Sequence, residues 1–156
     1  MRRLLNGPGP VAKPAGAVAT AAFVVGGLLV IWLSYIHFHL WQSVGYRHIP
    51  TIGPLFLAQS IAGLVLGLAV LAIRRIWVAI VGAGFAVATM GGFLISVEYG
   101  LFGFTDSWSA PFASVAFAVE IATVVVLAIA VVACLAPSAQ AGRTGSTPAA
   151  SPSPSA

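Results

Sequence analysis

Residues 54–97 read PLFLAQSIAGLVLGLAVLAI-RR-IWVAIVGAGFAVATMGGFLISV, two long apolar runs joined by Arg74 and Arg75. The hydrocarbon core of a bilayer is about 30 Å thick and a helix rises about 1.5 Å per residue, so about 20 apolar residues can cross it. Each run reaches that length. The stretch therefore predicts a transmembrane helical hairpin whose tight turn is the arginine pair.

Apolar stretches on either side of this hairpin extend the pattern to a four-helix transmembrane bundle, an all-α fold. The four predicted spans are about 17–38, 54–73, 76–97 and 111–135. Together they predict one folded domain over residues 16–136. The first span is expected to be a true span rather than a signal peptide, because its apolar run is too long and ends in large aromatic residues.

Proline and serine residues mark the expected starts of two of these helices. Pro54 and Pro111 fall where a first helical turn would be, a position at which the missing N–H of proline costs nothing. Ser107 and Ser109 are candidate caps for the last span, since a serine hydroxyl accepts hydrogen bonds from free N–H groups at a helix start. The pattern predicts defined helix beginnings at the end of the bundle opposite the arginine pair.

The composition excludes several classes of protein. The chain has 156 residues, of which 60% are hydrophobic and 6% charged, whereas soluble domains carry about 25% charged residues. The apolar content excludes disorder along the whole chain, and the single cysteine, Cys134, excludes a disulfide scaffold. Residues 1–15 and the Ser/Pro/Ala-rich residues 137–156 differ from the rest, and both segments are predicted to be disordered and cytoplasmic.

Positive charges predict the orientation in the membrane. In a four-span arrangement six cations fall on one side and only Arg47 falls on the other. The six are Arg2, Arg3, Lys13, Arg74, Arg75 and Arg143. Because positive residues are retained on the cytoplasmic side, both termini are expected inside, in a bacterial plasma membrane. The basic charge then faces anionic lipid, and no nucleic-acid partner is expected because no domain carries a basic groove.

Two outer loops, 40–52 and 99–110, are expected to lie among lipid headgroups, because they are rich in aromatic side chains. These side chains are Trp41, Tyr46, Tyr99, Phe102, Phe104 and Trp108. Each loop leads into a proline near the start of a helix. The two halves of the chain are therefore similar in layout, although no residue-by-residue repeat is present.

Small residues at helical spacing predict the faces along which the helices pack. The second span carries Gly63 and Gly67, four residues apart. The other faces are Gly27, Val30, Ser34 and His37 in the first span; Gly84, Ala88, Gly92 and Ser96, with Gly91 beside them, in the third; and Ser109, Ala113, Ala116, Glu120, Thr123, Leu127, Ala130 and Cys134 in the fourth. Such stripes are interpreted as contacts between helices rather than as a cofactor site.

Glu120 is the most unusual residue of the four spans. It lies about nine residues into the last span, about 13 Å below its outer end at 1.5 Å per residue. An ionisable group at that depth rarely faces lipid and costs about 2.5–3.5 kcal/mol to insert. Glu120 is therefore expected to point into the bundle, either as a protonated acid that donates a hydrogen bond or as a carboxylate with a partner. A functional role and a structural hydrogen bond between helices both remain open.

Further polar residues are expected in the same half of the membrane. His37 ends the first span, Gln59 lies near the start of the second, and Glu98 ends the third. If all of them face inward, they form an outward-opening polar pocket with Glu120 at its floor. His37 and Glu98 have an alternative interpretation as residues of the water interface. Arg47 is a candidate either for an ion pair with an outer acid, Glu98 or Asp106, or for binding an anionic headgroup or substrate.

Histidines raise the alternative of a metal site. If the helix unwinds after His37, then His37, His39, His48, Glu98 and Asp106 can gather Zn²⁺ or Cu²⁺, since these residue types are ligands of both ions. The competing interpretation is that the loop histidines are simply solvated. The spacing follows no established metal motif, so no cofactor is predicted and zinc or copper stays an alternative.

The layout of four spans, Gly-rich helices and a polar outer half resembles small uncharacterised membrane proteins common in high-GC bacteria. It is also loosely similar to the DoxX-like four-helix group. The most distinctive stretch is residues 46–56, YRHIPTIGPLF. The resemblance covers the four spans, concerns architecture, and implies a membrane bundle without assigning functional residues.

Three functions follow as hypotheses. The first is a non-catalytic accessory or small-ligand-binding membrane protein that uses the outer polar pocket. The second is a proton-coupled small transporter in which Glu120 titrates, and it requires a homo-oligomer because four helices rarely enclose a pathway alone. The third is a membrane metal or redox protein that uses His37, His39, His48 and Glu98. The expected partners are the lipid bilayer and either a second copy or another membrane protein.

Overall fold

A computed structural model describes residues 16–136 of the chain. Within them are four helices long and apolar enough to cross a membrane, and no β-strand. The helices are α2 (Ala17–His39), α3 (Ile52–Ile73), α4 (Ile76–Tyr99) and α5 (Ala113–Leu135). The predicted all-α four-helix fold is confirmed, and the chain is a multi-pass membrane protein. The terminal segments 1–15 and 137–156, predicted to be disordered, lie outside the described residues.

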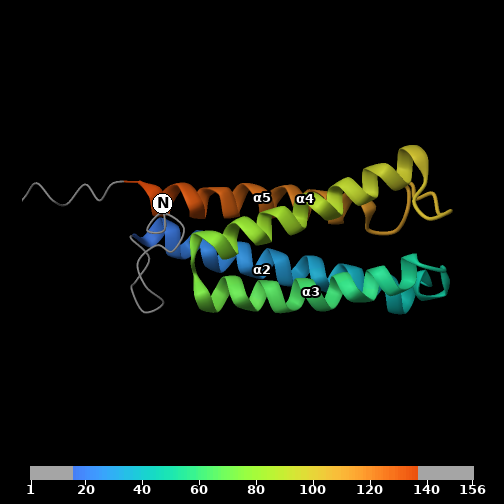
Figure 1. The fold of residues 1–156 in the computed structure, drawn as a ribbon, viewed down its shortest axis with the longest axis horizontal. Helices are drawn as coiled ribbons and strands as arrows, with labels where there is room; N and C mark the ends of the chain where they lie inside the picture. The colour runs from blue at the N-terminus through green and yellow to red at the C-terminus, as the bar shows by residue number, and fades with distance from the viewer. Residues whose placement is uncertain (1–15, 137–156) are drawn as a thin grey trace, which may run out of the picture.

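The four helices do not pack equally along their lengths (Figure 1). α2 runs beside α3 and α5, and α4 packs mainly on α5, whereas α3 and α4 share few contacts. Figure 1 shows α4 leaving α3 at the Arg74–Arg75 connection and diverging from it toward the opposite end of the bundle. We call the end with this connection the turn end. The opposite end, which carries residues 40–51 and 100–112, is the loop end.

Glycines bring α2 and α3 together. A Cβ atom at Gly67 would lie 2.9 Å from the carbonyl oxygen of Gly27 and 2.6 Å from Ile31 Cγ1, so the two backbones meet at this point. Gly63 and Gly67 are both buried. On the same pair of helices the Ser34 hydroxyl donates a hydrogen bond to the carbonyl of Ser60. The predicted small-residue faces of the first two spans are therefore the faces that pack.

The predicted face of α4 is confirmed at Ser96, which is buried, but is wrong at its glycines and at Ala88. Gly84 and Ala88 are exposed, and a Cβ atom at Gly84, Gly91 or Gly92 would meet nothing within 4 Å. The buried residues of α4 are instead Ile76, Val78, Ala79, Gly82, Ala86 and Ser96. The physical reason is the divergence of α4 from α3: the glycine face turns toward the gap between them, while the opposite side packs on α5.

The predicted start of the last helix also needs correction. α5 begins at Ala113, so Pro111 lies before the helix rather than in its first turn. Ser107 and Ser109 do not cap it: their hydroxyls bond to each other at 2.6 Å, and the N-cap residue is Phe112, with a positive φ of 63°. Pro54 does occupy the first turn of α3, as its third residue.

The two connections at the loop end are compact. α2 continues as a π-helical turn, Leu40–Val44, which ends at Gly45 with φ 101°, and a 3₁₀ turn, Tyr46–His48, follows. In the other connection Leu101 and Phe104 exchange backbone hydrogen bonds of 2.7 and 3.0 Å around Phe102 and Gly103, both with positive φ. Tyr46 is buried and Phe104 half-buried, so these two aromatic residues point inward rather than into the headgroup region, in contrast to the prediction.

Candidate functional site

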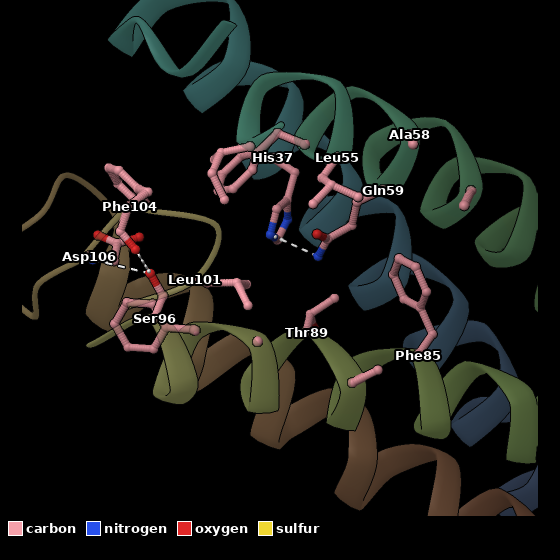
Figure 2. Close-up of a pocket in the computed structure, with 16 residues that line it drawn as sticks. His37, Leu55, Ala58, Gln59, Phe85, Thr89, Ser96, Leu101, Phe104 and Asp106 are labelled. Carbon is pink, nitrogen blue, oxygen red and sulfur yellow. Dashed lines mark hydrogen bonds between the residues drawn. The ribbon is translucent and has the colours of Figure 1, made fainter. Parts of the chain in front are cut away.

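The divergence of α3 and α4 leaves a cavity of about 430 Å³ at the loop end (Figure 2). Most of its wall is apolar, with Leu55, Phe56 and Phe85 among the lining residues. Its polar side chains are His37, Gln59, Thr89, Ser96 and Asp106. An apolar cavity with a few convergent polar groups is the usual form of a small-molecule site.

His37 and Gln59 form the polar centre of the α2–α3 wall. His37 is buried, and its Nδ1 lies 2.9 Å from the carbonyl oxygen of Leu33. A carbonyl oxygen only accepts hydrogen bonds, so Nδ1 carries the proton and donates the hydrogen bond. The other ring nitrogen, Nε2, lies 2.9 Å from Gln59 Nε2, which donates to it. The imidazole is therefore a neutral tautomer whose Nε2 accepts from Gln59, so both of its ring nitrogens are hydrogen-bonded within the protein.

Ser96 holds Asp106 against the cavity. The Ser96 hydroxyl donates to the carbonyl of Phe104 at 3.2 Å and accepts from the backbone N–H of Asp106, also at 3.2 Å. Figure 2 shows this pair on the side of the cavity opposite His37 and Gln59. The Asp106 carboxylate accepts from the Ser107 N–H at 2.8 Å. The loop between α4 and α5 thus brings an acidic group to a site framed by helices.

Tyr46 connects the two loops beneath this acid. Its hydroxyl donates to Asp106 over 3.4 and 3.5 Å, and its ring packs on Phe56 and Phe104. Burial, followed by the negative charge of Asp106 and the hydrogen bond to it, raises the pKa of Tyr46 to about 12. The phenol stays protonated and remains a donor to Asp106 throughout the physiological range.

A second, smaller chamber of about 50 Å³ lies behind the first. Glu120 lines it, with only 3% of its surface exposed, inside the bundle as its helical face predicts. His37, Thr89, Phe93 and Asp106 line both spaces and separate them. Thr89 is next to the Glu120 carboxyl, and the Thr89 hydroxyl donates a hydrogen bond to the carbonyl of Ala86 at 2.9 Å.

The structure brings together only some of the predicted site residues. Gln59 and His37 line the larger cavity and Glu120 lines the smaller one. Glu98 is exposed and lines neither, because it lies two residues, about 200° of helix, from the buried Ser96. Arg47 is exposed too, and its Nε donates to His48 Nε2 at 3.0 Å rather than to an acid of the other loop.

Four polar residues line the cavity or the chamber although the sequence pattern does not predict them there: Thr89, Ser96, Tyr46 and Asp106. The sequence predicts Asp106 as a candidate metal ligand and Tyr46 as a residue of the headgroup region. A signal was present for Ser96, which lies on the small-residue face of its helix. No sequence signal shows that the loop folds back to bring Asp106 to the cavity.

The three histidines lie in separate surroundings. His39 stacks on Tyr35 at 6.1 Å and meets Phe112 edge-on at 5.3 Å between ring centroids. His37 is hydrogen-bonded to Gln59, and His48 is hydrogen-bonded to Arg47. Among residues 16–136 no group of three or more His, Cys, Asp or Glu side chains is positioned to hold a metal ion.

Comparison with protein-family models, with curated proteins and with solved structures finds no match to this chain. The geometry of the cavity and of the chamber behind it is therefore the basis for the functional proposal.

Proposed function

We propose that this membrane protein binds a small organic molecule in the cavity between α3 and α4 and performs no catalysis of its own. The observation that carries the proposal is the cavity of about 430 Å³ with His37 and Gln59 on one wall and Asp106 on another. Glycine contacts and the Ser34–Ser60 hydrogen bond hold α2 against α3, so the wall that presents His37 and Gln59 is preorganised.

The cation distribution supports an orientation for this site. With Arg74 and Arg75 on the cytoplasmic side, the loop end faces outward and both termini lie inside. The cavity then lies in the outer half of a bacterial plasma membrane. A ligand reaches it from the outer aqueous phase or from the outer leaflet.

Benzyl alcohol is a suitable first probe because it combines a ring, for the apolar wall, with one hydroxyl for the polar groups. We expect saturable binding by detergent-purified protein, measured as a rise in the thermal unfolding midpoint with probe concentration. Gln59→Leu removes the amide on the cavity wall and should abolish this rise. Gln42→Leu is the matched control, since Gln42 is exposed and does not line the cavity.

Two outcomes would contradict the proposal. One is a response that grows without saturation, as simple partitioning into the micelle would give. The other is an equal response in both variants, which would place binding away from Gln59.

A second candidate function is proton-coupled transport by a homo-oligomer. The specific observation that favours it is the chamber of about 50 Å³, in which Glu120 shares the lining with His37, Asp106 and Tyr46. A carboxyl group inside a membrane bundle beside other titratable groups is typical of proton pathways. The test is proton uptake by liposomes that contain the protein, followed with an internal pH-sensitive dye. Transport requires that Glu120→Gln abolish the uptake while the variant stays folded, whereas a structural role predicts a change in stability alone.

A further inference from the structure

The cavity does not end at its polar groups. Ala62 on α3 and Phe85 on α4 line both this cavity and a shallow groove of about 620 Å³, so the two spaces adjoin. The remaining lining residues of the groove are Val65, Leu66, Ala69 and Val81. The space between α3 and α4 is therefore polar at the loop end and purely apolar toward the turn end.

The polar groups at the loop end can be sorted by what they offer a ligand. The Ser96 hydroxyl donates its hydrogen bond to the carbonyl of Phe104, and the Thr89 hydroxyl donates its hydrogen bond to the carbonyl of Ala86, so neither donor is available to a ligand. Gln59 uses one amide hydrogen on His37, which leaves its carbonyl oxygen and one hydrogen. The Asp106 carboxylate accepts from Ser107 and, over long distances, from Tyr46. Since each carboxylate oxygen can accept two hydrogen bonds, acceptors outnumber donors in the cavity.

We propose that the ligand is a single-chain amphiphile with a hydrogen-bond-donating head, an amine or an alcohol, whose head lies between Gln59 and Asp106 and whose chain lies in the groove between α3 and α4. This inference rests on the proposed function and specifies its ligand class. A head with donors matches the excess of acceptors, and the Asp106 carboxylate disfavours an anionic head by like-charge repulsion.

The direction of the polarity also argues for this occupant over a second copy of the chain. A molecule with one polar end and one apolar chain, aligned with the helices, satisfies both parts of the space at once. A packed helix would bury apolar residues against the groove but would supply no donor to the Gln59 carbonyl oxygen or to the acceptor sites of Asp106 that Ser107 and Tyr46 leave open. An acceptor that is left without a hydrogen bond inside a bundle is destabilising.

The test uses the full chain in phosphatidylcholine nanodiscs and measures binding by equilibrium dialysis. The probes are dodecylamine, dodecanol and dodecanoate, which differ in the head, and butylamine, which has the same head as the first and a short chain. We expect dodecylamine to bind about tenfold or more tightly than dodecanoate and than butylamine, where each factor of ten corresponds to about 1.4 kcal/mol. Dodecanol should bind more tightly than dodecanoate.

Variants separate the head site from the chain site. Ala62→Phe places a ring at the junction of cavity and groove, and it should remove the advantage of dodecylamine over butylamine. Ala72→Phe is the matched control on the same helix, because Ala72 is exposed and lines neither space. Asp106→Asn should reduce the preference for the amine over dodecanoate.

The outcomes distinguish this inference from the proposed function. If benzyl alcohol binds in a Gln59-dependent way but chain length has no effect, or dodecanoate binds best, the amphiphile is overturned and the small-molecule site stands. If neither benzyl alcohol nor any of the four probes binds saturably, the proposed function itself is overturned. Dodecylamine binding that Ala62→Phe and Ala72→Phe weaken equally would place the chain outside the groove and also overturn the amphiphile.

Discussion

The two ends of the bundle are built from the same four helices but differ in how closely these helices approach. At the turn end an apolar cluster forms the core, with Phe23, Val30, Val70 and Leu127 among its fully buried members. At the loop end α3 and α4 separate, and the space between them receives His37, Gln59 and Asp106. The comparison shows how a small bundle can combine a close-packed end, which holds the fold, with an open end, which holds a site.

The open end is itself asymmetric. The α2–α3 wall is fixed by the Ser34–Ser60 hydrogen bond and, nearer the turn end, by the glycine contact at Gly27 and Gly67. The α4 wall lacks such contacts with α3, and its position depends on α5 and on the loop that Ser96 anchors. One wall therefore presents preorganised polar groups, while the other can adjust to an occupant.

The largest expected effect comes from separating the helices at the close-packed end. Gly67→Ala places a Cβ atom 2.9 Å from the backbone oxygen of Gly27, an atom that cannot move without shifting α2. We expect a loss of about 2 kcal/mol in the free energy of unfolding, within the usual range for overpacking. The measurement is reversible unfolding in mixed micelles with an increasing fraction of sodium dodecyl sulfate.

Gly84→Ala is the control, because a Cβ atom at Gly84 meets nothing within 4 Å. This substitution should leave stability unchanged or raise it by up to about 1 kcal/mol through helix propensity. An equal loss in both variants would contradict the difference between a packed α2–α3 contact and an open α4 face.

A smaller effect is expected from the loop anchor at the open end. Ser96→Ala removes the hydrogen bonds to the Phe104 carbonyl and from the Asp106 N–H, so we expect a loss of about 1–2 kcal/mol in stability. Hydrogen exchange at the Asp106 amide should become faster, and binding of benzyl alcohol should weaken. Ser114→Ala is the control, since Ser114 is an exposed serine of α5. Unchanged exchange at Asp106 would show that Ser96 does not hold the loop.

Much of the fold could be predicted because its determinants are local. The length of each apolar run and the position of Arg74 and Arg75 define the spans within two residues of the observed helices. Glycine pairs show where two backbones can approach, and this was sufficient for Gly63 and Gly67. On α5, the face that carries Glu120 and Leu127 is buried, as its spacing predicts.

The site could be predicted only in part, because it depends on which helices separate. Spacing shows that Gly84 and Gly92 share a face of α4, but it cannot show that this face meets a gap. The prediction that Glu98 points inward assumed that α3 packs against that side of α4, but α3 and α4 diverge at the loop end. Asp106 reaches the cavity through a loop whose turn has Phe102 at φ 53°. Because positive φ is uncommon for residues other than glycine, a phenylalanine at this position does not predict such a turn.

The smallest effect at neutral pH, and the most specific to the loop end, concerns the Tyr46 phenol. Its pKa in the folded protein is about 12, raised from 10.0 mainly by burial and then by Asp106. Below pH 10 the phenol is protonated in both folded and unfolded chains, so its contribution to stability is fully present. Between pH 10 and about 12 the unfolded chain releases this proton while the folded chain keeps it, so stability falls as the pH rises.

Tyr46→Phe removes this dependence, because phenylalanine does not ionise. The difference between wild type and variant in tyrosinate absorbance should show one phenol that ionises near pH 12, and the difference in unfolding free energy should decrease from pH 10 upward. The same variant should leave the Gly67 contact at the turn end unaffected, so that Tyr46→Phe and Gly67→Ala have additive effects on stability. A Tyr46 phenol that ionises near pH 10 would show that the loop end admits water to Tyr46 and Asp106, and that the buried link between the two loops is not formed.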